Sequence, residues 1–125
     1  MNIINLTRYT ANENQKSAGA FDLSGEDHDA LISMLTFTAL PSAREIEERA
    51  IAIAKLASKY KPDMAMIGGS PACSEPFLMS TLERELRNER ITPVYPFSIM
   101  VRFEEKDGMV PQPSFMHLGF VNPRV

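Results

Sequence analysis

Short apolar segments alternate with amphipathic helical patterns along most of this chain, and this alternation limits the possible folds more than any other feature. The apolar segments cover residues 2–6, 20–23 and 64–67, and the helical patterns cover 10–19, 26–35, 43–60 and 77–89. Strands that alternate with helices are joined by crossovers, so they lie parallel in one sheet with helices on both faces. The order therefore predicts an α/β fold with three layers.

Capping residues indicate where the helices begin and end. Three helix starts carry serine or threonine with an acidic residue three positions later: Thr10 with Glu13, Ser24 with Asp27, and Ser42 with Glu45. In a capping box each side chain accepts a hydrogen bond from the other residue's backbone N–H. Gly19 is suited to end the first helix, and Pro62 stops the third. Pro76 is expected in the first turn of the fourth helix, because deeper in it would clash with a carbonyl.

The last part of the chain has the pattern of an antiparallel hairpin. Apolar and polar side chains alternate over 94–105, and a second strand is expected over 113–121. Residues 106–108, Lys-Asp-Gly, supply turn chemistry between them. Pro96 favours an edge position or an irregular ladder, because proline has no N–H to donate. The complete prediction is a single domain over 1–125, with a mostly parallel sheet of about five strands that ends in this hairpin.

Composition favours a globular protein of the reducing cytoplasm. The 125 residues are 44% hydrophobic and carry a net charge of −3, with a pI near 5.4. General nucleic-acid binding needs a basic face, which this charge balance does not favour. The only cysteine, Cys73, excludes an intrachain disulfide. Neither a secretion leader nor an apolar run of membrane-spanning length is present in the sequence, so a cytoplasmic location is expected and a membrane partner is not.

Two predicted strand exits supply the candidate ligand site. In a sheet of order 2-1-3-4-5, the strand order reverses between the first and third strands, and ligands bind at such a reversal. The exits there contribute Thr7, Arg8 and Tyr9 from one strand, and Gly68, Gly69 and Ser70 from the other. Glycine permits a positive φ and close approach of a ligand, backbone N–H groups favour an anion, and an arginine binds phosphate or carboxylate. Alternatively, the glycines serve only a tight connection and Arg8 is only a surface charge.

Several well-defined sites are not indicated. The P-loop pattern and the G-x-G-x-x-G fingerprint are both missing, so neither a nucleotide triphosphatase nor ordinary dinucleotide binding is expected. Asp22 ends the second strand, where it is either a ribose-binding carboxylate or a simple loop residue. His28 and His117 have no His or Cys at ligand spacing, so no metal and no cofactor is predicted. We expect His28 to be solvated.

Cys73 and His117 are the weak candidates for catalysis. A thiol near a helix start can have a lowered pKa and become a nucleophile, with a histidine as its base. His117, however, is expected toward the far edge of the sheet from Cys73. The alternatives are an ordinary loop cysteine and a structural histidine, and the catalytic residues stay unknown.

Two segments carry a family resemblance, INLT and AMIGG-S-P, and the second leads into FLMSTLERELR. In these segments the chain resembles small uncharacterised bacterial proteins with a Rossmann-like fold. The layout is also similar to the compact CRISPR-associated Rossmann-fold (CARF-type) proteins, which bind and sometimes cleave cyclic oligoadenylates. This resemblance covers most of the chain in element order. It implies a ligand over Thr7, Arg8 and Gly69 at the shared face of a dimer. The acidic charge balance and residues 72–75 depart from that pattern.

These patterns leave three alternative functions. The first is binding of a phosphorylated small molecule or nucleotide at the carboxyl ends of the first and third strands. The second is a structural or interaction protein that forms a homodimer through its Met- and Phe-rich C-terminal strands. The third is a metal-independent phosphodiesterase or hydrolase, in which Arg8 or backbone amides stabilise developing charge. Whether any reaction is catalysed is left open.

Overall fold

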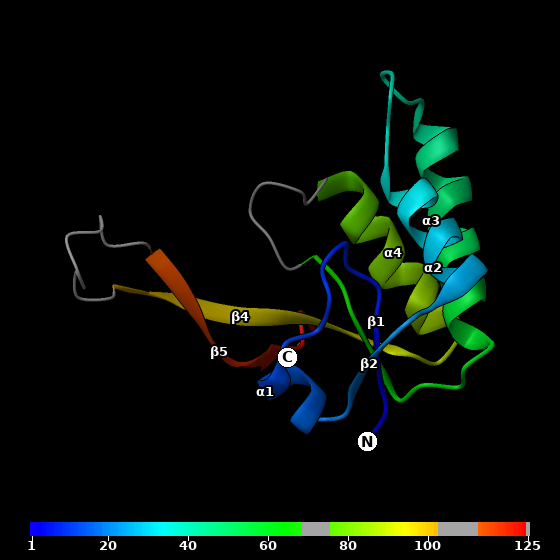
Figure 1. Cartoon of the computed structure of the whole chain (residues 1–125). Coiled ribbons are helices and arrows are strands. Elements are labelled where there is room, and N and C mark those ends of the chain that lie inside the picture. Colours follow the sequence, from blue (N-terminus) through cyan, green and yellow to red (C-terminus); the bar gives the residue numbers. More distant parts are fainter. Residues whose placement is uncertain (69–75, 103–112, 125) are drawn as a thin grey trace.

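The computed structural model describes residues 1–68, 76–102 and 113–124. Its elements are β1 (Ile3–Asn5), α1 (Glu13–Ser17), β2 (Ala20–Asp22), α2 (Gly25–Leu35), α3 (Ala43–Ser58), β3 (Met64–Met66), α4 (Pro76–Asn88), β4 (Thr92–Arg102) and β5 (Pro113–Val121). They form the α/β arrangement that the sequence predicts, with the expected order of strands and helices (Figure 1).

One sheet of order β2-β1-β3-β4-β5 joins the five strands. β1 pairs in parallel with β2 and β3, β3 pairs in parallel with β4, and β5 runs antiparallel to β4. This confirms the mostly parallel, Rossmann-like sheet with a C-terminal antiparallel pair. The strand order reverses between β1 and β3, as predicted, because the chain first moves from β1 to one neighbour and then crosses to the other.

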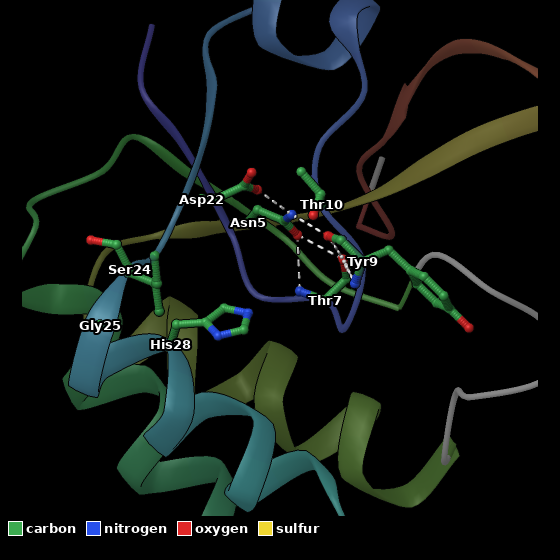
Figure 2. A pocket seen from close by; sticks show the side chains of 9 residues that line it. Asn5, Thr7, Tyr9, Thr10, Asp22, Ser24, Gly25 and His28 are labelled. Carbon is green, nitrogen blue, oxygen red and sulfur yellow. Dashed lines mark hydrogen bonds between the residues drawn. The ribbon is translucent and has the colours of Figure 1, made fainter.

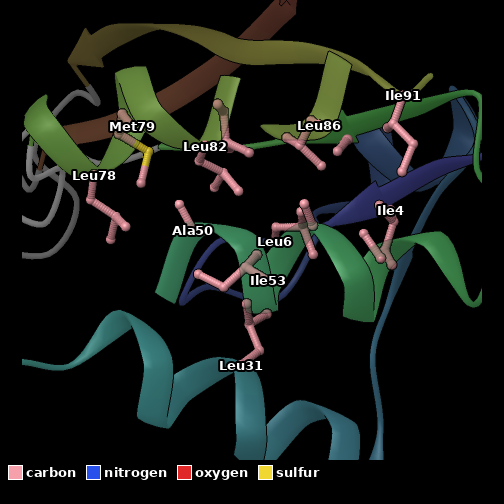
Figure 3. Close-up of a cluster of buried hydrophobic side chains, with 14 of the residues drawn as sticks. Ile4, Leu6, Leu31, Ala50, Ile53, Leu78, Met79, Leu82, Leu86 and Ile91 are labelled. Atoms are coloured by element: carbon pink, nitrogen blue, oxygen red, sulfur yellow. The ribbon is translucent and has the colours of Figure 1, made fainter. Parts of the chain in front are cut away.

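The larger part of the core lies between the sheet and helices α2, α3 and α4. Ile4 projects from β1 into this cluster, where it joins side chains from all three helices (Figure 3). The cluster includes Leu31 of α2, Ile53 of α3 and Leu82 of α4, each at most 1% exposed. A side chain buried to this extent contributes about 1.5–3 kcal/mol to folding. The helical layer therefore fixes the position of β1.

A smaller cluster covers the opposite face of the sheet. Ile3, which is adjacent to Ile4 and therefore faces the other way, packs there with Ala11, Ala20 and Met66. Phe120 of β5 packs against the same group. This second face is covered by α1, its flanking loop and the end of β5 rather than by long helices.

The first helix starts later than the capping pattern predicts. Its N-cap is Asn12, whose side chain accepts from the N–H of Gln15 at 2.8 Å, while the Gln15 side chain accepts from the Asn12 N–H at 2.9 Å. The predicted box of Thr10 and Glu13 is therefore wrong. The two patterns overlap in sequence, and the structure uses the amide version. The backbone N–H of Ala11, which precedes it, donates to Asp22 Oδ1.

The other predicted helix ends are largely confirmed. Ser42 caps α3 by accepting from the N–H of Glu45, and α4 begins at Pro76. Ser24 occupies the N-cap of α2, but its side chain makes no capping hydrogen bond. Gly19 follows α1 with a φ of +111°. In the described ranges, none of the helices combines the length and the apolar character required to cross a lipid bilayer.

β4 and β5 form an arm that extends beyond the parallel sheet (Figure 1). β3 pairs only with the first part of β4, up to Val94, whereas β5 pairs with β4 from Tyr95 to Arg102. Pro96 lies in this second part, so it occupies the irregular ladder that the sequence indicates. A bulge interrupts the ladder after Phe97. The predicted turn at 106–108 lies outside the described residues.

Candidate functional site

The predicted exits of β1 and β3 do meet at a common hollow. Thr7, Arg8, Tyr9 and Gly68 line it together with three apolar side chains. Gly68 has a φ of +77°, which a glycine adopts without strain. The hollow measures only about 10 Å³, which is the space of a single water molecule. The two other predicted ligand-binding residues, Gly69 and Ser70, lie outside the described residues.

Arg8 has partners within the protein. Its Nη2 donates to the carbonyl oxygen of Leu35 at 2.6 Å and to Oγ1 of Thr36 at 3.1 Å. These acceptors form the C-terminal end of α2, where the carbonyls carry the negative end of the helix dipole. Arg8 thus ties the loop after β1 to α2, which is more than the surface charge considered as its alternative. Its role in binding a ligand stays a prediction.

A larger cavity lies on the other side of β1, between the exits of β1 and β2 and the start of α2 (Figure 2). It measures about 230 Å³. Its wall is made of Asn5, Thr7, Tyr9, Thr10, Asp22, Leu23, Ser24, Gly25 and His28. Thr7 and Tyr9 therefore line both hollows, one on each side of the loop after β1.

Asn5 organises the floor of this cavity. The parallel register places it beside Asp22, since both are the last residues of their strands. Its Nδ2 donates to Asp22 Oδ1 at 2.8 Å and to the Tyr9 carbonyl at 2.6 Å. Its Oδ1 accepts from Thr7 N at 3.0 Å and from Thr7 Oγ1 at 2.7 Å. With the side chain only 4% exposed, every one of its hydrogen-bonding sites is used to shape the loop.

Asp22 places a carboxylate at the cavity wall. Its Oδ1 accepts from Asn5 Nδ2 and from the backbone N–H of Ala11 at 3.0 Å. Its second oxygen, Oδ2, has no hydrogen-bond partner within residues 1–68, 76–102 and 113–124. One oxygen of Asp22 therefore holds the structure, and the other has no hydrogen-bond partner among these residues.

The start of α2 forms the opposite wall. Ser24 is the N-cap, and Gly25 comes next with a φ of +59°. His28, one turn along the helix, points its imidazole into the cavity (Figure 2). The expectation that His28 is solvated holds in part, because its side chain is about half exposed, at 47%. Its Nδ1 lies 3.8 Å from the carboxylate of Asp29.

The polar groups of the wall select for hydrogen-bond donors and small dipoles rather than for a bare anion. The lining contains one carboxylate, Asp22, and one imidazole, His28, but no lysine or arginine. A phosphate next to Asp22 would meet like charge. A hydroxyl or amino group would instead donate to its free oxygen, and Ser24 would donate or accept beside it.

Sequence reasoning did not assign six of the wall residues to the site, namely Asn5, Thr10, Leu23, Ser24, Gly25 and His28. The order 2-1-3-4-5 makes β1 a neighbour of β2 as well as of β3, so it also brings the exits of β1 and β2 together. The sequence feature that could have indicated the cavity between β1 and β2 was Asp22, a carboxylate at the end of β2.

The proposed catalytic pair remains a prediction. Cys73 lies outside the described residues. His117 is opposite Ser98 in the β4–β5 ladder, and its ring packs edge-on to Phe120 at a centroid distance of 4.9 Å. Burial lowers the pKa of His117, and its Nδ1 has no hydrogen-bond partner in the described part of the chain. Among those same residues there is no group of three or more His, Cys, Asp or Glu side chains suited to a metal.

Comparison with known proteins gives no relative: no family model, no curated protein and no solved structure matches the chain. The resemblance to CARF-type and other small Rossmann-like proteins therefore stays a prediction. Any function of this protein has to be inferred from the geometry and chemistry of its own residues.

Proposed function

We propose that this protein binds a phosphorylated small molecule or nucleotide at the carboxyl edge of its sheet, with the hydroxyl-bearing part of the ligand in the cavity between β1, β2 and α2. The observation that carries this proposal is the cavity of about 230 Å³, whose lining includes Asp22, a carboxylate with one oxygen that has no partner among the described residues. Sheets of this kind bind ligands at this edge.

The size of the cavity favours one part of a ligand rather than a whole nucleotide. Pockets that enclose drug-sized molecules measure about 300–1,000 Å³, and this one is smaller. A sugar ring with hydroxyl donors fits its volume and its chemistry. Asp22 Oδ2 accepts from one hydroxyl, and Ser24 and His28 offer further polar contacts on the opposite wall.

The phosphate would extend away from Asp22, past the loop after β1. Thr7 and Tyr9 line the cavity and also the small hollow beside Gly68. A ligand that crosses this loop reaches the side where Arg8 and the Gly68 turn lie, which is the anion site expected from the sequence. Arg8 would then exchange or share its contact with the Leu35 carbonyl.

Catalysis is not part of this proposal. The hydrolase alternative depends on Cys73, which is outside the described residues, and on His117, which lies in the β4–β5 arm and does not line the cavity.

Isothermal titration with ribose 5-phosphate, adenosine, adenosine monophosphate and inorganic phosphate tests this function. We expect the sugar-bearing compounds to bind and phosphate alone to bind more weakly. Asp22→Asn keeps an oxygen for Asn5 and Ala11 but removes the charge. A hydrogen bond to a charged group contributes about 1.5–3 kcal/mol, so this variant should lose roughly tenfold or more in affinity.

Asp29→Asn is the matched control. Asp29 lies on α2 next to His28, carries the same charge and is 86% exposed, but it does not line the cavity. The control should bind as the wild type does. Equal binding by Asp22→Asn and the wild type would exclude Asp22 as a ligand contact, and no binding of any compound by the wild type would reject the function.

A further inference from the structure

The strand β5 is the outer edge of the sheet. In the order β2-β1-β3-β4-β5 it has β4 on one side, and no described strand lies on the other. Its outward backbone groups are therefore positioned to pair with a further strand, as at any sheet edge. The arm that β5 forms with β4 extends away from α2, α3 and α4, so these helices do not cover it (Figure 1).

This edge lacks the charges that usually prevent strands from pairing. The nine residues Pro113–Val121 include no lysine, arginine, aspartate or glutamate. Edge strands are commonly protected by such charges, by proline or by bulges. β5 has proline only at its first position and one bulge in its ladder with β4. Most of its length therefore remains suited to pairing.

Large apolar side chains are exposed along the arm. Phe97 of β4 and Met116, Leu118 and Val121 of β5 are each 46–53% exposed. Apolar patches of a few hundred Å² on soluble proteins commonly mark interaction sites. Three of these four exposed side chains thus lie on β5, the strand that forms the exposed edge, which relates them to one partner.

We infer that the partner is a second copy of this chain, which pairs its own β5 antiparallel to the first across a twofold axis. A second copy supplies an apolar strand without charges, which matches the composition of this edge. Each chain has a net charge of −3, but contact through β5 brings no like charges together. The paired edges form one continuous sheet through both subunits, an isologous contact in which each subunit presents the same surface.

The register of this pairing is set by where the exposed side chains lie. An axis at His117 places Met116 of one subunit opposite Leu118 of the partner subunit, the two exposed residues that flank His117. Leu118 is also the extra residue at the bulge, which has no partner on β4, so the bulges of both subunits lie beside the axis. A strand of this length spans about 30 Å, so the contact is at or below the standard size of about 800 Å² per partner. The dimer should therefore be reversible and depend on concentration.

Sedimentation equilibrium from about 1 µM to about 1 mM protein, without any ligand, tests the inference. The wild type should pass from monomer to dimer over this range. Leu118→Lys should raise the dissociation constant at least tenfold, because it places a charge in the pairing. Leu40→Lys is the matched control, since Leu40 is 98% exposed in the segment between α2 and α3, away from the arm, and it should dimerise as the wild type does.

Met116→Lys provides a second variant in case Leu118→Lys disturbs the fold, which circular dichroism would reveal. Amide hydrogen exchange should show slower exchange in β5 at high protein concentration than at low concentration. A wild type that stays monomeric over the whole concentration range would overturn the inference. This holds even if β5 is then found to bind a different protein. A dimer that both β5 variants leave intact would overturn it as well. Because no ligand is used, this result is independent of the proposed binding function.

Discussion

Replacing Asn5 with aspartate changes one atom of the network that shapes the cavity, because the Nδ2 donor becomes an oxygen. In the wild type, Nδ2 lies 2.8 Å from Asp22 Oδ1 and 2.6 Å from the Tyr9 carbonyl oxygen. Asn5→Asp keeps both hydrogen bonds from Thr7, since Oδ1 remains an acceptor. The variant therefore exchanges an attraction for a repulsion at an almost unchanged volume.

The expected cost at neutral pH is about 3 kcal/mol of unfolding free energy. Two carboxylates about 4 Å apart repel by roughly 4 kcal/mol at an effective dielectric constant near 20, and sharing a proton relieves part of this. Protonation removes the repulsion, so the pKa of the pair is raised in the folded state. A group of this kind favours the folded state below its unfolded pKa, near 4, and this advantage is lost as the pH rises. Asn5→Asp should thus be least destabilised in acid.

Urea unfolding followed by circular dichroism at pH 7 and pH 4.5 measures this difference. The double variant Asn5→Asp with Asp22→Asn reverses donor and acceptor between the two strands and should recover part of the loss. The recovery is incomplete because the amide group that donates to residue 5 no longer accepts from the Ala11 N–H. The Tyr9 carbonyl loses its Nδ2 donor in both variants, because the single proton of the Thr7 hydroxyl, 3.1 Å away, is donated to the side chain of residue 5 at 2.7 Å. A loss below about 1 kcal/mol for the single variant, or no recovery in the double variant, would refute the pairing described for Asn5 and Asp22.

Three further substitutions test the surrounding structure. Arg49→Met should lower the unfolding free energy by about 1.5–3 kcal/mol in urea titration, because Arg49 donates to the C-terminal carbonyls of α2 and stacks on Phe37. An unchanged midpoint of urea unfolding would contradict this role. Gly19→Ala should cost about 1–3 kcal/mol in thermal unfolding, since its Cβ would collide with the Met1 carbonyl oxygen at a φ of +111°. A fully stable variant would show that the N-terminus moves aside. Burial lowers the pKa of His117, so the unfolding free energy of the wild type should decrease as the pH falls below about 6.5. His117→Phe should flatten this pH dependence in calorimetry, and an identical slope would show that other groups cause the pH dependence.

The sheet could be predicted because its signals are local and repeated. Short apolar segments between helical patterns gave the element order, and the strand order 2-1-3-4-5 is typical of such a fold. The first helix start could not be predicted in the same way. Thr10 with Glu13 and Asn12 with Gln15 are both plausible capping pairs, and the structure uses the second. Just before it, Ala11 donates to Asp22, which holds this loop against β2. That contact joins segments that are separate in the sequence.

The sequence predicts that the exits of β1 and β3 meet, but not that the larger cavity lies between β1, β2 and α2. The meeting of Thr7, Arg8, Tyr9 and Gly68 is a consequence of strand order alone, and the structure confirms it. Which side of the β1 loop offers space depends on side-chain packing, which strand order does not determine. The carbonyl partner of Arg8 lies 27 residues away, at Leu35. The helical pattern of α2 likewise does not indicate that His28 faces the exit of β1.

Mapping ligand contacts by NMR tests the central claim most directly. Uniformly ¹⁵N-labelled protein would be titrated with adenosine monophosphate and ribose 5-phosphate, and amide shifts would be assigned along the chain. We predict that the largest changes occur at Asn5, Thr7, Ser24 and His28 around the cavity, with smaller changes at Gly68. Changes confined to other surfaces, or none at saturating ligand, would contradict the claim that the exits of β1 and β2 and the start of α2 form the binding site.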